Sequence, residues 1–221
     1  MQKCPLDTVY RSTDEEHELF CNQIRDRQPE RSTLEGYFGD RHGGEHDLVD
    51  CVRFGLQRQQ HTKQPLAWLT CTHKGASEVC RAALAEAGVA KEELTDGYYS
   101  DPTSKSDLPI VFKKGLLYRL TRNIDKQRGF VNGALAEGVE SLDANRVFTV
   151  RPLASGSMVL VHPMNEDGQR FWPCCDGYAT TIRRAQGCGF YRGCIYFDLS
   201  KRHAAKVYGY VAESRLKTKQ G

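Results

Sequence analysis

The sequence has no apolar run long enough to cross a membrane, and its first twenty residues lack the apolar centre of a secretory signal. No Asn-x-Ser/Thr glycosylation site and no C-x-x-C pair occur among its 221 residues. These absences argue against a membrane protein, a secreted disulfide scaffold and a zinc ribbon. The nine cysteines are therefore expected to be mainly reduced and buried, in an intracellular protein.

Phosphate-binding loops are also missing. Neither the G-x-x-x-x-G-K-[ST] pattern nor the dinucleotide pattern G-x-G-x-x-G occurs, so the sequence shows no cradle of backbone N–H groups for a triphosphate. No G-x-S-x-G nucleophile elbow is present either. A Ser/His/Asp or Cys/His site stays open, because such side chains meet in space rather than in sequence.

One short metal-like pattern does occur, the stretch HGGEH from His42 to His46, which matches the H-x-x-E-H pattern of some zinc peptidases. Zinc ligation of that kind needs both histidines on one turn of a stable helix, and each interior glycine costs a helix about 1 kcal/mol. The surrounding residues 36–47, GYFGDRHGGEHD, are typical of a loop. We therefore expect no metal site here.

Charge is nearly balanced overall, with a formal net charge of +3, but it is unevenly placed. Residues 113–128, KKGLLYRLTRNIDKQR, are rich in Lys and Arg and hold a single Asp, and the chain is basic again from Lys201. A local basic face of this kind favours a polyanionic partner. The alternative is an ordinary solvated surface.

The first half of the chain predicts helices followed by a strand-helix unit. Residues 13–31 predict a helix capped by Thr13 or Asp14, with Leu19, Phe20 and Ile24 on one face. Residues 65–72 predict a buried strand, and residues 74–88 a helix that ends at Gly88. A strand that runs into a helix through a short polar turn is half of a βαβ unit, which indicates an α/β layer with a parallel sheet.

The pattern changes to short strands between Leu108 and Cys175, including 108–115, with turn residues such as Asn132-Gly133 and Asp167-Gly168 between them. A small antiparallel β-barrel inserted in an α/β domain accounts for this change. Residues 177–187 then predict a helix, and 194–199 and 206–214 predict strands. The expected domains are an N-terminal helical and loop segment (1–64), the main domain (65–107 and 177–221) and the inserted barrel (108–176).

Two stretches carry a resemblance to a known family. TIRRAQG (181–187) and YVAESR (210–215) resemble motifs V and VI of superfamily-one DNA helicases of the PIF and RecD type. In the matching order, residues 115–139 resemble the family's segment that opens its inserted barrel. Residues 68–84 resemble the strand-turn-helix that begins the second motor domain, and 8–26 the region that precedes it. The resemblance thus covers almost the whole chain.

The resemblance implies the second RecA-like domain of such a helicase, an α/β parallel-sheet domain with an inserted small antiparallel β-barrel. In this family the first motor domain supplies the Walker A and B motifs, and they do not occur in this sequence. The family's motors close two such domains on ATP and step along single-stranded DNA in repair and recombination. We expect ATP and Mg²⁺ to be used only with a Walker-containing domain, on this or a separate chain. The alternative is a non-enzymatic nucleic-acid-binding remnant.

The nucleotide side of the site follows from the motifs. Arg215, the last arginine of motif VI, is the implied catalytic residue, a finger that stabilises charge on the γ-phosphate. Gln186 and Gly187 in motif V are implied to bind nucleotide together with Arg215. The sequence departs from the family at Glu213, where an apolar residue is usual. A surface salt bridge is the alternative role for Arg215.

The DNA side of the site follows from the same motifs. Thr181 is implied to hydrogen-bond a DNA phosphate, and Thr72 is a further candidate from the first strand-helix turn. Arg183 stands where the family usually has histidine, and it keeps a donor that can reach phosphate. Arg184, its neighbour, is the fourth residue expected to bind single-stranded DNA.

Overall fold

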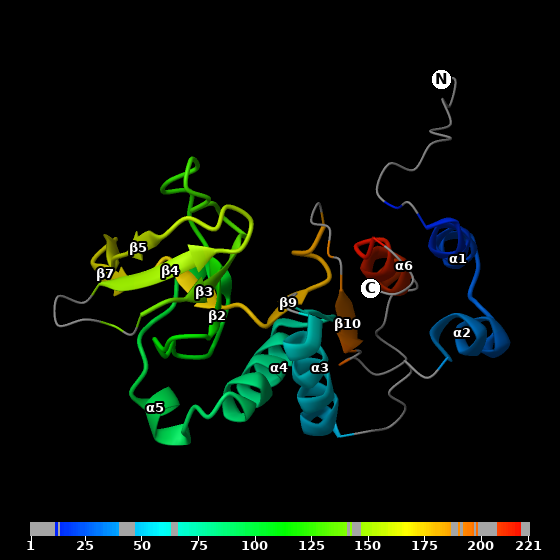
Figure 1. The fold of residues 1–221 in the computed structure, drawn as a ribbon, viewed down its shortest axis with the longest axis horizontal. Helices are drawn as coiled ribbons and strands as arrows, with labels where there is room; N and C mark the ends of the chain where they lie inside the picture. Colours follow the sequence, from blue (N-terminus) through cyan, green and yellow to red (C-terminus); the bar gives the residue numbers. More distant parts are fainter. Residues whose placement is uncertain are drawn as a thin grey trace. The chain divides into compact units, whose positions relative to one another are not determined.

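The computed structural model describes residues 12, 14–39, 47–62, 66–140, 142, 147–186, 190, 192–196, 198 and 207–217. Their helices and strands form two compact units (Figure 1). Unit 1 combines Met1–Thr72 with Thr180–Gly221, and unit 2 is the continuous segment His73–Ala179. The domain boundaries drawn from the sequence stay a prediction.

Unit 1 is built around a three-stranded sheet with the order β10-β1-β9. Its central strand β1 (Ala67–Thr70) is buried throughout and pairs in parallel with β10 (Gly193–Tyr196). The third strand, β9 (Ala179–Thr181), lies on the other side of β1. A strand buried on both faces explains the unbroken apolar run of β1. Strands occur where 65–72 and 194–199 predicted them, but both are shorter, and β10, expected to be buried, is only half-buried.

Three helices precede this sheet in the chain: α1 (Glu15–Asp26), α2 (Arg31–Phe38) and α3 (Leu48–Thr62). The carboxylate of Asp14 caps α1 by accepting a hydrogen bond from the backbone N–H of His17 at 3.1 Å. The ring of Phe20 stacks on that of Tyr37 with centroids 3.7 Å apart, which joins α1 to α2. Aromatic stacking therefore fixes the first two helices against each other.

The first predicted helix is wrong at its C-terminal end. It was expected to run to residue 31, but α1 ends at Asp26 and the chain is non-helical up to Glu30. Pro29 explains the break, because proline disfavours helical backbone in the residue before it. Leu19 is 61% exposed, so it does not share the buried face with Phe20.

The loop predicted for 36–47 is wrong at its start, because α2 continues to Phe38. Tyr37 is buried in that last turn, and its packing against Phe20 compensates for the poor helix propensity of Gly36. The HGGEH stretch, 42–46, lies outside the described residues, and so does Gly187.

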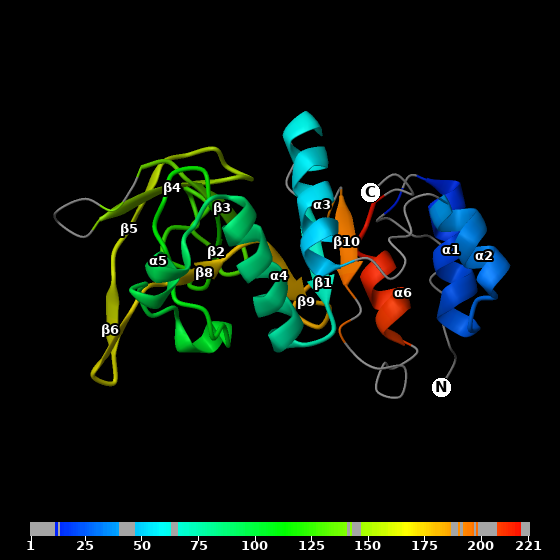
Figure 2. The ribbon, with the colours of Figure 1, turned by 90° about the horizontal axis from the view of Figure 1, so that it is seen from below.

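Residues 206–214 were expected to form a strand, and this is wrong, because α6 (Val207–Glu213) is a helix. Tyr208, Val211 and Ala212 recur at helical spacing and pack with Leu69 and Ile182 in one hydrophobic cluster. Burial against that cluster decides in favour of the helix. Figure 2 shows α6 between β10 and the pair of helices α1 and α2.

Residues 177–187 were expected to form a helix, and this is also wrong. The segment begins with β9 and continues as a turn over Ile182–Gln186. The backbone N–H of Ile182 donates to the carbonyl of Thr70 at 2.8 Å. Sheet pairing with β1 thus outweighs the local helical pattern of the sequence.

Unit 2 begins with α4 (His73–Glu86), followed by α5 (Lys91–Thr95) and the short 3₁₀ helix η2 (Pro102–Ser104). The predicted helix at 74–88 is confirmed. Gly88 follows α4 with a φ of 77°, a left-handed conformation that glycine adopts readily at helix ends.

The rest of unit 2 is the antiparallel insertion. Five strands form one curled sheet with the order β5-β4-β3-β2-β8. They are β2 (Leu117–Leu120), β3 (Leu135–Gly138), β4 (Phe148–Pro152), β5 (Val159–Val161) and β8 (Cys174–Asp176). A separate hairpin joins β6 (Met164–Glu166) to β7 (Gln169–Phe171). The predicted fold class, an α/β parallel-sheet domain with an inserted small antiparallel β-barrel, is confirmed, and the sheet of the insertion is a curled half-barrel.

The strand predicted at 108–115 is wrong, because it is reduced to one antiparallel bridge between Tyr98 and Ile110. Pro109 lacks a backbone N–H, which limits the ladder that this segment can form. Its aromatic residue nevertheless serves the core: Phe112 packs on Tyr118, Phe148 and Trp172 with ring centroids 4.4 to 6.0 Å apart.

The cysteines of the described residues are free thiols, in agreement with the expectation of reduced cysteines. Those of α4 and β8 (Cys80, Cys174 and Cys175) are buried, and the other four are half-buried. Within the same residues, no helix combines the length and the apolar character that crossing a bilayer requires.

Candidate functional site

The turn that follows β9 gathers most of the residues expected to contact ligand. Thr181 opens it: its hydroxyl oxygen accepts from the backbone N–H of Arg184 at 3.3 Å, and its carbonyl accepts from that of Ala185 at 3.0 Å. The side chains of Arg183, Arg184 and Gln186 are exposed on this turn. One turn therefore presents two guanidinium groups and one amide to solvent.

The same turn is anchored by its buried residues. Ile182 and Ala185 are each 1% exposed and pack with Leu69 of β1 and Ala212 of α6. This core cluster ties the turn to the end of the central strand and to α6. Arg183 and Arg184 therefore stand on a fixed scaffold, which reduces the entropy lost when they bind a ligand.

Thr181 itself is buried, with 4% of its surface exposed. Its side-chain oxygen caps the turn, as an N-cap threonine does at the start of a helix. The structure thus brings Thr181, Arg183, Arg184 and Gln186 together, but it gives Thr181 a backbone-capping contact that the motif alone did not indicate.

Thr72 lies in a second polar cluster, after β1. The carboxylate of Asp198 accepts from the backbone N–H of Cys71 at 2.7 Å and from that of Thr72 at 3.1 Å. The hydroxyl of Thr72 also donates to this carboxylate. Because β1 and β10 are parallel, the residues that follow both strands meet at one edge of the sheet.

Asp198 was missed by the sequence analysis. The only available signal was an acidic residue directly after the strand-like run CIYF. The carboxylate of Asp198 accepts the hydrogen bond of the Thr72 hydroxyl and places a negative charge at this edge of the sheet. Burial, together with this charge, raises the pKa of Cys71 to about 11. Thr72 therefore helps to hold the loop after β1 against the residue that follows β10.

Arg215 follows α6, and its guanidinium turns back onto the helix. Its Nε donates to the carbonyl of Val211 at 3.1 Å, and one Nη donates to the hydroxyl of Ser214 at 2.9 Å. A cation suits the C-terminal end of a helix, where carbonyl groups lack intrahelical partners. The side chain is half-buried in this position.

The backbone around Arg215 is held from two sides. The backbone N–H of Phe190 donates to the carbonyl of Arg215 at 2.7 Å, and that of Lys217 donates to the carbonyl of Phe190 at 3.1 Å. From α1, the ring Nε2 of His17 lies 3.1 Å from the carbonyl oxygen of Leu216. The sequence analysis identified none of these supports, because they join residues far apart in the chain.

His17 is a buried residue of α1, on the side of that helix that contacts the segment after α6. Its Nδ1 lies 2.5 Å from the hydroxyl of Tyr37, while Nε2 bonds the Leu216 carbonyl. Burial lowers the pKa of His17, against the opposing effect of the Leu216 carbonyl. The neutral ring fits this geometry, with Nε2–H as donor and Nδ1 as acceptor.

Glu213, expected beside the arginine finger, is only 3% exposed. Burial and the charge of Glu213 raise the pKa of Cys21 to about 12, while Arg215 lowers it. Both charged residues therefore act on the same thiol of α1. Glu213 belongs to the buried contact between α6 and α1 rather than to an open surface.

The basic run 113–128 does not form one free basic face. Arg122 pairs with Asp101 at 2.6 Å and Glu166 at 2.7 Å, and Lys113 pairs with Glu93 at 2.9 Å. Arg119 is buried and donates to the carbonyl of Gly133 at 3.2 Å. Several of these basic side chains therefore have partners within unit 2, so fewer of them are available for the DNA-binding surface expected from the sequence.

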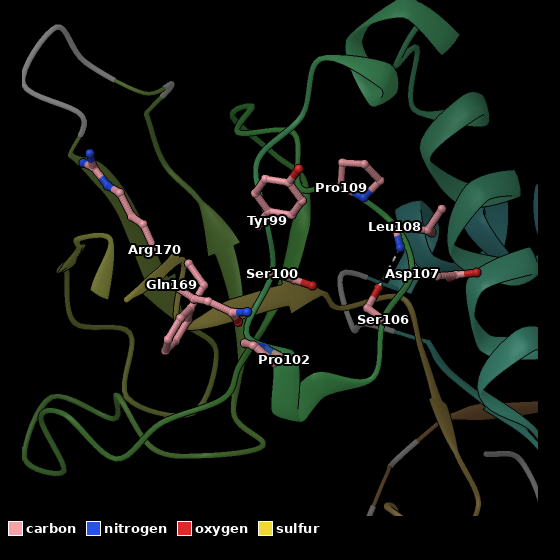
Figure 3. A pocket seen from close by; sticks show the side chains of 10 residues that line it. Tyr99, Ser100, Pro102, Ser106, Asp107, Leu108, Pro109, Gln169 and Arg170 are labelled. Atoms are coloured by element: carbon pink, nitrogen blue, oxygen red, sulfur yellow. Dashed lines mark hydrogen bonds between the residues drawn. The ribbon is translucent and has the colours of Figure 1, made fainter. Parts of the chain in front are cut away.

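Unit 2 also contains a pocket of about 490 Å³ that the sequence did not indicate. Its lining comes from three segments: Tyr99, Ser100 and Pro102; Ser106 to Pro109; and Gln169 to Phe171 of β7 (Figure 3). No group of His, Cys, Asp and Glu side chains in the described ranges could hold a metal ion.

Comparison with known proteins places this geometry in a known fold. No family model matches the chain, and none of the curated proteins matches it. Solved structures do match. The chain is similar to the Pif1 helicase from Bacteroides in complex with ADP-AlF3 and single-stranded DNA, with 18% identity, a TM-score of 0.66, and coverage of 98% of this chain and 50% of that one.

Two further structures agree. Bacteroides Pif1 bound to single-stranded DNA has a TM-score of 0.63 at 18% identity, with coverage of 97% of this chain and 49% of that one. The Pif1 helicase from Candida albicans also has a TM-score of 0.63, at 15% identity, with coverage of 97% and 54%. The chain thus spans about half the length of these proteins and shares their fold. The resemblance noted in motifs V and VI is confirmed at the level of the fold.

Proposed function

We propose that this chain is the second motor domain of an ATP-dependent DNA helicase of the PIF type, a motor that moves along single-stranded DNA. The observation that carries the proposal is one hydrophobic cluster in unit 1. It joins the Arg183–Gln186 turn to β1 and to α6, the helix that Arg215 follows. Motifs V and VI, widely spaced in sequence, thereby share one rigid support.

The DNA contact is assigned to Arg183 and Arg184. Both are exposed on the turn after β9, where guanidinium groups can bind phosphate oxygens in bidentate geometry. Thr181 shapes the turn through its capping contact and orients these side chains. Thr72 supports the neighbouring loop through Asp198. Charge and shape here suit a phosphate backbone without selecting a base sequence.

The nucleotide contact is assigned to Arg215 of motif VI and to Gln186 and Gly187 of motif V. These residues fit the outer side of a triphosphate, since they offer donors for its oxygens but no enclosing loop. ATP and Mg²⁺ would be held mainly by a Walker-containing domain, on this or another chain. Bound there, the nucleotide would supply the energy of phosphoryl transfer, and Arg215 would stabilise charge on the transferred group.

The proposed partners are single-stranded DNA and that Walker-containing domain, in an intracellular setting of DNA repair or recombination. A second candidate function, a nucleic-acid-binding remnant without an ATP cycle, is favoured by one observation. The guanidinium of Arg215 is engaged with Val211 and Ser214 of its own helix end. To act as an arginine finger, Arg215 would have to break these hydrogen bonds before its guanidinium could reach a phosphate.

ATP hydrolysis tests the proposal. The purified chain alone is expected to show no DNA-stimulated turnover, and a fusion that joins a Walker-containing first domain ahead of Met1 is expected to show it. The first domain by itself is the control. A fusion that folds and binds single-stranded DNA but does not hydrolyse ATP supports the remnant instead. Turnover by the chain alone, after repurification, contradicts the half-motor assignment.

A further inference from the structure

Tyr99 is the most exposed of the large hydrophobic residues in the described chain, with 83% of its surface accessible. Its position is rigid, however. The carbonyl of Tyr99 accepts from the backbone N–H of Trp172 at 3.0 Å, and Ser100 forms a parallel bridge with Trp172. On the other side, Tyr98 forms an antiparallel bridge with Ile110. Tyr99 therefore stands on backbone that is paired at both edges.

Strand alternation explains why the ring is outside. The ring of Tyr98 packs against Phe112 and Trp172, with ring centroids 5.5 and 5.8 Å apart, although 37% of the residue stays exposed. Its neighbour Tyr99 therefore faces the opposite way, because successive side chains of extended backbone alternate. An exposed aromatic ring on a fixed scaffold contributes nothing to the core. It is a platform available to a flat ligand.

The pocket beside Tyr99 has a fixed floor. Phe171 is 2% exposed, and the guanidinium of Arg122 lies 5.2 Å from its ring centroid. Arg122 is in turn held by the buried carboxylate of Asp101. This ion pair holds the guanidinium of Arg122 beside the ring of Phe171, which lines the pocket.

The walls of the pocket offer both neutral and charged hydrogen-bonding groups. Figure 3 shows the amide of Gln169 pointing toward Ser100 and Pro102, on the side of the pocket opposite Pro109. Arg170, the next residue of β7, points away from Gln169. The lining thus combines one open aromatic face, proline rings and an amide, with the cation of Arg170 at the rim. It also includes the carboxylate of Asp107, which accepts a hydrogen bond from the hydroxyl of Ser77.

We infer that this pocket is a base-stacking site for single-stranded DNA, in which one nucleobase stacks on Tyr99, Gln169 bonds the base edge and Arg170 meets the adjoining phosphate. The inference rests on the proposed function, and it adds a contact in unit 2 to the phosphate contacts of unit 1. An aromatic face accepts every base, so the site suits a protein that moves along DNA without reading its sequence. A single exposed ring also fits one base better than it fits an extended peptide, which needs a series of pockets.

The test measures, by fluorescence anisotropy, the affinity of the full chain for two oligonucleotides of about twelve nucleotides. One is oligothymidylate, and the other is an abasic strand with the same number of phosphates. The chain is expected to bind oligothymidylate more tightly. Tyr99→Ala is expected to lose about tenfold in affinity for oligothymidylate and little for the abasic strand, since base stacking on an aromatic residue contributes roughly that much. Tyr99→Phe keeps the ring and is expected to bind like the parent chain. Phe54→Ala, a change at another exposed aromatic residue, is the matched control, since Phe54 is 60% exposed.

A photo-crosslink gives the second readout. Oligothymidylate with one 5-iodouracil is expected to crosslink to Tyr99, and the Gln169→Ala variant to crosslink less. If the chain binds oligothymidylate with a normal salt dependence but Tyr99→Ala has no effect, the stacking site is wrong and the proposed function stands. If the chain binds neither strand at any salt concentration, both are wrong. Tyr99-dependent binding of a proline-rich peptide, without preference for bases over the abasic strand, identifies a peptide site and overturns the inference.

Discussion

The carboxylate of Asp198 accepts hydrogen bonds from both the backbone N–H and the hydroxyl of Thr72, and so joins the residues that follow β10 and β1. The two residues are 126 positions apart in the sequence. This contact fixes the loop after β1. Thr72 therefore has a structural role, which is to hold this loop through Asp198.

Removing this carboxylate should lower stability. Asp198→Ala leaves the N–H groups of Cys71 and Thr72 without their acceptor, and the free energy of unfolding should fall by about 1 to 3 kcal/mol. Urea denaturation measures the change. Asp50→Ala, which removes an exposed ion pair with Arg53, is the control and should change stability by less than about 0.5 kcal/mol. Equal effects of the two changes would show that the Asp198 contacts contribute little.

The two exposed arginines of the turn should set the salt dependence of DNA binding. For each phosphate contact that Arg183→Ala or Arg184→Ala removes, the slope of log affinity against log salt should become shallower by about 0.7. Titrations of oligothymidylate at several salt concentrations measure the slope. Arg81→Ala, a change on the exposed surface of α4, should leave it unchanged. Unchanged slopes in both turn variants would remove this turn from the DNA path.

Arg122 should behave differently from these arginines. Arg122→Ala leaves the buried carboxylate of Asp101 without its cation, so the free energy of unfolding should fall by about 3 kcal/mol. The hydrogen bonds from Thr103 and Thr121 to Asp101 remain and limit the loss. The salt slope of DNA binding should stay as in the parent chain. A shallower slope with unchanged stability would reverse this assignment and restore the basic-run prediction.

Arg215 should matter for turnover and little for folding. In the fusion with a Walker-containing domain, Arg215→Lys should lower DNA-stimulated ATP hydrolysis by roughly 10³-fold or more, because lysine lacks the planar fork of donors that meets the developing charge. Stability and DNA affinity should change little. Arg31→Lys, at an arginine whose side chain is 91% exposed, is the matched control. Parent-like turnover in Arg215→Lys would leave Arg215 with only its contacts to Val211 and Ser214.

The pH dependence of stability should be dominated by Asp176. Burial raises its pKa to about 7, and among the described residues neither of its carboxylate oxygens has a hydrogen-bond partner. The folded chain thus holds a proton that the unfolded chain releases near pH 4, and stability should fall as pH rises from about 4 to 7. The full effect is at most about 4 kcal/mol, since each pKa unit corresponds to 1.36 kcal/mol.

Asp176→Asn should flatten this part of the profile, so that its stability relative to the parent chain rises between pH 5 and pH 8. Thermal unfolding at a series of pH values measures it. Asp167→Asn, a change at the exposed tip of the β6–β7 hairpin, should keep the parent slope. A parent chain whose stability is flat across this range would mean that Asp176 is charged and has a partner.

The sequence predicted the elements that local pattern determines and missed those that distant contacts determine. The buried strand β1 and the helix α4 were predicted from local pattern, with ends that differ from the observed ones by one or two residues. In α6, by contrast, the alternation of Val207 to Val211 reads as a strand, and only the packing of Tyr208 and Ala212 on Leu69 makes it a helix. The same distinction holds for the residues of the candidate site. Arg183 and Gln186 were found through their motif, whereas Asp198 and His17 act on residues more than a hundred positions away.

The discontinuity of unit 1 has a consequence for the order of folding during synthesis. β1 leaves the ribosome well before either of its sheet neighbours, because the whole of His73–Ala179 is made in between. Unit 2 is one continuous segment, so its contacts are complete while β9, β10 and α6 are still being added. The exposed apolar edge of β1 therefore waits for the last stretch of the chain, and closing such a long loop is slow. Nascent chains halted just after residue 180 has emerged from the ribosome should contain a folded half-barrel and an unpaired β1, a state in which chaperones protect the chain from aggregation.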